Sequence, residues 1–84
     1  MAFFSIFSPD AEYETAPDDT IARYRDWELH RICCDTVELR RHGRTIGRAW
    51  DDGIHVVVAT RADGRTIHGD WIDPILDRLA ETGR

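Results

Sequence analysis

Two related stretches decide the fold of this chain: Val37-Glu-Leu-Arg-Arg-His-Gly-Arg-Thr-Ile-Gly-Arg-Ala-Trp-Asp-Asp52 and Val58-Ala-Thr-Arg-Ala-Asp-Gly-Arg-Thr-Ile-His-Gly-Asp-Trp-Ile-Asp73. Eight of their sixteen aligned positions are identical, where chance would give about one. Each stretch joins two β-rich segments through His-Gly or Asp-Gly, dipeptides that supply the positive φ angles of a tight hairpin turn. Two copies are too few for a stacked-repeat protein. We therefore predict a duplicated β-hairpin within one sheet.

A two-residue turn in each copy fixes which residues face each other. In the first copy Leu39 would face Ile46, and in the second Val58 would face Gly69. This register gathers the apolar residues, with the tryptophan of each copy, on one face of the sheet. It also puts Arg48 on that face, a conflict that a β-bulge or a slipped pairing would resolve.

The segments on either side complete an α+β fold. An Asp51-Asp52-Gly53 turn joins the two hairpins into a four-stranded antiparallel meander over residues 36–71. Asp73 and Pro74 then begin a helix over residues 73–82, and its apolar stripe should cover the tryptophan face of the sheet. Residues 20–34 fit either a helix or a fifth strand, and the spacing of the later strands favours the strand. The prediction is a meander of four to five strands packed by a short C-terminal helix.

The first twenty residues differ in charge from the rest. They hold five acids and no arginine, so they carry the whole formal net charge of −5, while residues 21–84 are neutral. With two prolines they predict an acidic arm over residues 1–20, before a sheet over 21–71. The apolar residues Phe3, Phe4, Ile6 and Phe7 would anchor this arm, as an edge strand or under the helix. All 84 residues are expected to form a single domain.

Size and cysteine usage limit the functional class. A chain of 84 residues has little room for an elaborate active site, which favours binding over catalysis. No apolar run approaches the roughly 20 residues of a membrane span. Cys33 and Cys34 are adjacent, and neighbouring cysteines rarely form a disulfide. We therefore expect reduced thiols and a cytoplasmic protein.

Two groups of residues could carry chemistry. His30, Cys33 and Cys34 could bind zinc or respond to oxidation, although adjacent cysteines lack the usual spacing of zinc ligands. On the polar face of the second hairpin, His55 and Asp70 could form a general-base pair, but no nucleophile accompanies them. No phosphate-binding loop or nucleophile elbow is present. The prediction is a protein without enzymatic activity, cofactor or bound metal.

The remaining functions are binding functions. Arginines near the predicted hairpin turns could support a nucleic-acid-binding sheet, but the net charge of −5 and a sequence pI near 5.2 oppose it. We expect another protein with a basic surface as partner, since Trp and Arg dominate interface hot spots and an acidic arm is steered to basic surfaces. A homodimer through edge strands is a further alternative. The candidate partner-binding residues are Asp10, Glu12, Glu14, Asp18, Asp19, Arg40, Arg44, Arg61 and Arg65.

Such a chain resembles, in kind, a known class of inhibitors. Small acidic single domains without catalytic groups are similar to the proteins that phages and mobile elements direct at nucleic-acid-handling machinery, such as anti-CRISPR proteins. The likeness is one of class and covers no motif. It implies an inhibitory protein-binding module of phage origin, beside the alternatives of a nucleic-acid-binding sheet and a zinc- or redox-responsive protein.

Overall fold

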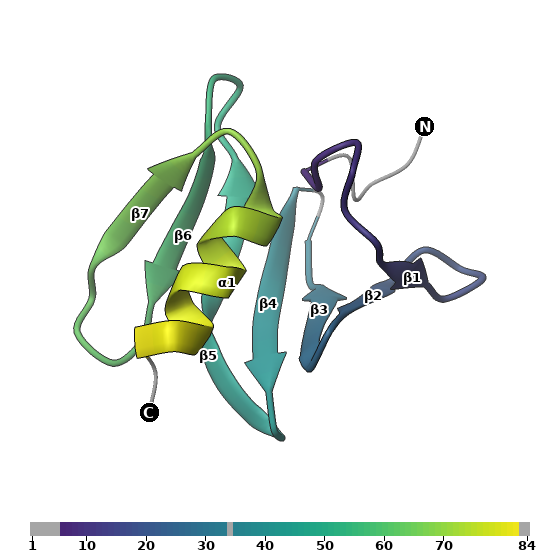
Figure 1. Ribbon diagram of the computed structural model, residues 1–84, viewed down its shortest axis with the longest axis horizontal. Helices are drawn as coiled ribbons and strands as arrows, with labels where there is room; N and C mark the ends of the chain where they lie inside the picture. Colours follow the sequence, from purple (N-terminus) through teal and green to yellow (C-terminus); the bar gives the residue numbers. More distant parts are fainter. Residues whose placement is uncertain (1–5, 34, 83–84) are drawn as a thin grey trace.

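The computed structural model of this protein describes residues 6–33 and 35–82. Within these residues the chain forms one antiparallel sheet of seven strands in sequence order, followed by one helix (Figure 1). The elements are β1 (Glu14–Thr15), β2 (Ile21–Tyr24), β3 (Trp27–Arg31), β4 (Thr36–Arg41), β5 (Arg44–Asp51), β6 (Val56–Thr60), β7 (Thr66–Gly69) and α1 (Ile72–Thr82). The α+β antiparallel meander with a C-terminal helix is confirmed, but the prediction of four to five strands is wrong.

The additional strands lie in the first third of the chain. Residues 20–34, for which the sequence favoured one strand, form the two strands of the β2–β3 hairpin. Its turn is Arg25-Asp26, and Arg25 has a positive φ of 55°, which is uncommon for a residue other than Gly, Asn or Asp. No turn dipeptide therefore marked it. Strand β1 pairs with β2, so the sheet begins within the segment that the sequence suggested as an arm.

The β4–β5 hairpin contains the predicted two-residue turn and a β-bulge. His42 and Gly43 both have positive φ, 52° and 77°, as a type I′ turn requires. Arg41 pairs with Arg44, but the register then shifts so that Leu39 pairs with Gly47 and leaves Ile46 as the extra residue. The bulge reverses the faces of the rest of β5, which turns Arg48 to solvent and resolves the conflict in the sequence.

The bulge also overturns the prediction for the two tryptophans. Trp50 lies on the face opposite buried Ala49, so α1 does not cover it. In the β6–β7 hairpin the connection is longer than predicted, and Val58 pairs with Ile67 instead of Gly69. Trp71 therefore follows β7 and pairs with no strand residue. The two indoles do not share a face of the sheet.

The core lies between the inner face of the sheet and α1. Ile72, Ile75 and Leu76 of the helix belong to one buried cluster with residues of the central strands, among them Leu39 and Val58. Figure 1 shows α1 lying across one face of the sheet, while the other face stays uncovered. We call this second face the outer face.

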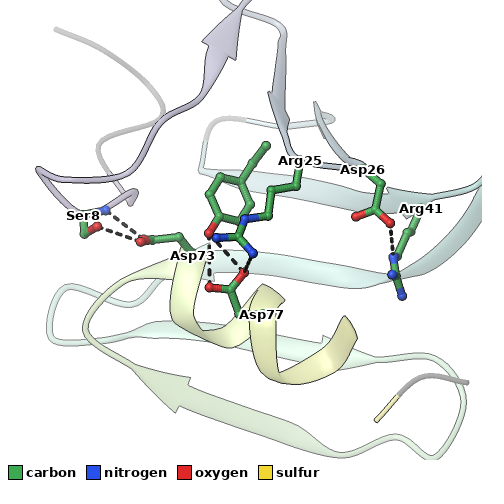
Figure 2. A network of polar contacts seen from close by, with 7 residues as sticks. Ser8, Arg25, Asp26, Arg41, Asp73 and Asp77 are labelled. Atoms are coloured by element: carbon green, nitrogen blue, oxygen red, sulfur yellow. Dashed lines mark hydrogen bonds and ion pairs between the residues drawn. The ribbon is translucent and has the colours of Figure 1, made fainter. Parts of the chain in front are cut away.

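Polar contacts fasten the helix to the early part of the chain (Figure 2). The Asp73 carboxylate in the first turn of α1 accepts hydrogen bonds from the backbone N–H of Ser8 (2.9 Å) and from its hydroxyl (2.7 Å). One turn later Asp77 accepts a hydrogen bond from the Tyr24 hydroxyl (3.0 Å). Just before Ser8, Ile6 and Phe7 are buried in the core. These two residues anchor the N-terminal segment as predicted, whereas Phe3 and Phe4 lie outside the described residues.

Candidate functional site

The connections of the meander alternate between two ends of the sheet, and these ends differ in charge. From β2 onward, residues 25–26, 42–43 and 61–65 connect strands at one end, and residues 32–33, 35, 52–55 and 70–71 lie at the other (Figure 1). The β1–β2 turn, residues 16–20, is counted with neither end. We count the residues of each connection together with the strand or helix residue that directly precedes and follows it. The first end then has five arginines and two aspartates, and the second has four aspartates and one arginine. We call them the Arg-rich end (Arg25, Arg41, Arg44, Arg61, Arg65) and the Asp-rich end (Asp35, Asp51, Asp52, Asp70).

The Asp-rich end also exposes apolar side chains. In the part of the chain that the structure describes, the exposed large hydrophobic residues are Ile32 (48%), Ile54 (80%) and Trp71 (39%). Each lies in a different connection of this end. Exposed apolar side chains are ordinary when scattered singly; here all three lie at the same end of the sheet, which favours an interaction surface there.

The aspartates of this end hold its central turn in a fixed shape. Asp52 accepts hydrogen bonds from the backbone N–H groups of His55 (2.7 Å) and Ile54 (2.9 Å), and Asp51 accepts one from Gly53 (2.8 Å). The bonds from His55 and Ile54 lower the pKa of Asp52 below its ordinary value. The turn that presents Ile54 is therefore rigid and negatively charged at neutral pH.

A row of side chains on the outer face adjoins the Asp-rich end. Thr36, Trp50, Val57 and His68 are in register across four strands, which spans about 14 Å at the usual strand spacing. Val57 is only 4% exposed although α1 covers the other face, so its neighbours in the row must shield it. The ring of His68 meets that of His55 edge-on at 6.2 Å. Both histidines are exposed, in agreement with the prediction that this side of the second hairpin is its polar face.

The rest of the outer face is a ladder of compensated charges. The Nε2 atom of His30 lies 2.9 Å from a carboxylate oxygen of Glu28, and Nε of Arg40 lies 2.6 Å from Glu38. These hydrogen bonds lower the pKa of Glu28 and of Glu38. Acids and bases alternate in these pairs, an arrangement that does not favour the binding of nucleic-acid phosphates.

The predicted partner-binding arginines occupy two places. Arg44, Arg61 and Arg65 lie at the same end of the sheet, the Arg-rich end, in or beside two different hairpin connections. Arg40 lies instead on the outer face, where it is paired with Glu38. The structure therefore brings three of the four together.

The predicted acidic residues do not form one patch. Asp18 accepts hydrogen bonds from the hydroxyl and backbone N–H of Thr20, which fixes the β1–β2 turn. Its neighbour Asp19 has a positive φ of 59° in the same turn, which Figure 1 shows pointing away from the other connections. Glu12 and Glu14 border a hollow of about 630 Å³ beside Arg23 and Arg25, and Asp10 is exposed before them. None of these five acids is among the four aspartates of the Asp-rich end.

The proposed zinc or redox group is only partly visible. His30 contacts Glu28, Cys33 is an exposed free thiol, and Cys34 lies outside the described residues. Among residues 6–33 and 35–82, no three His, Cys, Asp or Glu side chains are placed to hold a metal ion together.

A groove of about 440 Å³ opens at the Arg-rich end, between β5, the β6–β7 connection and α1. Its apolar lining is Trp27, Ile46, Ala62 and Leu79, and its polar lining is Arg41, Thr45, Thr60, Arg61 and Asp63. Sequence reasoning missed this groove because it depends on the bulge at Ile46. The one available signal was the misplaced Arg48 of the unbulged register.

Comparison with known protein families, with curated proteins and with solved structures finds no match to this chain. The helix of the described residues is too short and too polar to cross a membrane. The site must therefore be interpreted from its own geometry.

Proposed function

We propose that this chain is a small, non-enzymatic protein-binding module that docks its Asp-rich end on a basic surface of another protein. The observation that carries the proposal is the gathering of Ile32, Ile54 and Trp71, all exposed, among four aspartates at one end of the sheet. Protein interfaces combine apolar anchors with a polar rim, and charge complementarity speeds their formation. The half-buried Trp50 beside this end extends the apolar area.

We further propose that this binding inhibits the partner protein. Aspartates held in a rigid turn, such as Asp51 and Asp52, can occupy a protein surface that otherwise binds phosphate groups. A partner that handles nucleic acid would then lose access to its substrate. Direct nucleic-acid binding is less well supported, because the outer face alternates acids with bases.

The test compares two double variants as bait in affinity capture. Ile54→Ser with Trp71→Ser changes two exposed residues of the Asp-rich end, and Arg44→Gln with Arg65→Gln makes a matched change at the opposite end. Trp71 is only 39% exposed, so its replacement also removes buried apolar area; a thermal unfolding curve must show that each bait is folded at the temperature of the capture. We expect a partner to be retained by the wild-type chain and the arginine variant, released by moderate salt, and lost with the Ile54 and Trp71 variant.

Capture of the same proteins by all three baits would contradict the proposal. For a captured nucleic-acid-binding partner, a gel-shift assay then measures inhibition directly. Addition of the wild-type chain should reduce complex formation, and addition of the Ile54 and Trp71 variant should not.

A further inference from the structure

We propose that the groove at the Arg-rich end binds a small molecule that joins an apolar body to a carboxylate, such as an arylacetate. The groove of about 440 Å³ falls within the range of small-ligand sites. Its floor combines the Trp27 ring with the aliphatic side chains of Ile46 and Leu79. This inference concerns the end opposite the proposed protein-binding surface and does not depend on it.

The groove is built by two features of regular structure. The bulge removes Ile46 from the β4–β5 ladder and leaves its side chain to line the groove. The backbone N–H of Arg61 donates a 2.9 Å hydrogen bond to the carbonyl of Ile46, which fixes the β6–β7 connection beside it. Bulges commonly re-aim a side chain next to a binding site, and a site fixed in this way loses little entropy when a ligand binds.

Two of the three charged side chains that line the groove, Arg41 and Asp63, are already paired. Nε of Arg41 lies 2.9 Å from a carboxylate oxygen of Asp26, and its guanidinium lies 5.6 Å from the centroid of the Trp27 ring (Figure 2 shows the Arg41–Asp26 pair). Asp63 lies 3.4 Å from Nε of Arg65 and accepts a hydrogen bond from the Thr60 hydroxyl.

Arg61 remains as the uncompensated charge. Among the described residues it makes no ion pair, and its side chain lines the groove. A guanidinium binds a carboxylate through two parallel hydrogen bonds. The ligand class follows from this pairing: the carboxylate meets Arg61, and the apolar body covers Ile46 and Leu79.

The experiment uses the full, isotope-labelled chain and two-dimensional NMR, with phenylacetate, the neutral phenylacetamide and inorganic phosphate as probes. Trp27 lies at the groove, whereas Trp50 and Trp71 lie near the opposite end. Because Trp27 also borders a second hollow with Asp77 and Glu81, the amide of Ile46 identifies the groove, and the Trp27 indole N–H identifies this end of the molecule. We expect saturable shifts of the Trp27 indole and the Ile46 amide with phenylacetate. Phenylacetamide should bind at least about fivefold more weakly, and phosphate should leave the Ile46 amide unchanged.

Two matched variants complete the test. Arg61→Gln should weaken phenylacetate binding about fivefold to tenfold and leave phenylacetamide binding unchanged. Arg44→Gln, at the same end but outside the groove lining, should have no effect. Absence of saturable shifts at Trp27 and Ile46, equal affinity for acid and amide, or equal losses in the two variants would each overturn the proposal.

Discussion

The tetrapeptide Gly-Arg-Thr-Ile begins a bulged central strand in the β4–β5 hairpin and a regular edge strand in the β6–β7 hairpin. In the first hairpin, His42 and Gly43 form a two-residue turn and Ile46 is the bulge residue. In the second, residues 61–65 form a longer connection, and Ile67 pairs directly with Val58. Equal sequence therefore gives unequal structure.

The residues around the tetrapeptide account for the difference. In the second hairpin, the Asp63 carboxylate accepts hydrogen bonds from the Thr60 hydroxyl (2.6 Å) and the Arg65 N–H (3.0 Å), which stabilise the wider loop. The residue that directly follows the tetrapeptide is Gly47 in the central strand and His68 in the edge strand. A Cβ atom at Gly47 would overlap the carbonyl oxygen of Ala59, whereas His68 has no strand on its other side.

The largest effect is expected from Gly47→Ala. The added methyl group must push β5 away from β6, because it meets the rigid backbone at Ala59, and we expect a loss of about 3 kcal/mol in the free energy of unfolding. The control, His68→Ala at the matching position of the other hairpin, should cost less than about 1 kcal/mol. Chemical denaturation measures both, and similar losses would refute the distinction between the two strands.

Single deletions should separate the hairpins further. Deletion of Ile46 leaves the pairing of Leu39 with Gly47 in place, but it removes a partly buried side chain and the carbonyl acceptor of the Arg61 N–H. We expect a loss of about 1–2 kcal/mol in the free energy of unfolding and a groove without its Ile46 lining. Deletion of Ile67 either places a polar residue at its position or reverses the faces of β7. We expect this deletion to lower the free energy of unfolding by about 2–3 kcal/mol. Denaturation curves and amide spectra check this order. The reverse order would mean that the bulge is needed for folding.

A smaller effect is expected from Asp63→Ala. The variant loses the acceptor for Thr60 and Arg65, so the unfolding midpoint should fall by a few degrees. Asp63→Asn keeps a side-chain oxygen and should restore most of this loss. A thermal unfolding series compares the three proteins, and equal midpoints for the alanine and asparagine variants would show that these hydrogen bonds do not matter.

The smallest effect concerns pH. The hydrogen bond from Thr60 lowers the pKa of Asp63 below its ordinary value of 3.8. The carboxylate therefore contributes its full stabilisation above about pH 4 and loses it as the pH falls through the lowered pKa. We expect the amide signals of Gly64 and Arg65 to shift only below pH 4 in an NMR titration. The step should disappear in Asp63→Asn, and its persistence there would assign it to another group.

The sheet was predictable where side-chain pattern and turn chemistry agree. The dipeptide His42-Gly43 predicted a type I′ turn, which the structure has. The helix of residues 72–82 begins within one residue of its predicted start. The misplaced charge of Arg48 indicated the bulge, but not which residue would form it. The β2–β3 turn left no such trace, because Arg25 adopts a positive φ without any glycine or asparagine in the turn.

The candidate surfaces were harder to predict because they depend on which connections share an end of the sheet. The sequence predicted one strand between residues 20 and 34, whereas the structure has two. Because each strand carries the chain to the opposite end of the sheet, the end at which the first connections lie could not be predicted. The exposure of Ile54 also depends on the shape of its turn, which the hydrogen bonds from the backbone N–H groups of Ile54 and His55 to Asp52 determine. The sequence indicated a turn at this place but not its shape. The groove depends on the bulge, the connection of residues 61–65 and α1 together.

The hydrogen bonds between Ser8 and Asp73 join residues 65 positions apart, while the hairpins pair neighbouring strands throughout. Neighbouring hairpins close short loops at small entropic cost and can form early during folding. The junction of Ser8 and Asp73 needs the first turn of α1, which follows all seven strands. On a ribosome, the hairpins can therefore form one after another as they emerge, whereas the contact of Ser8 with Asp73 has to wait until the start of α1 has emerged.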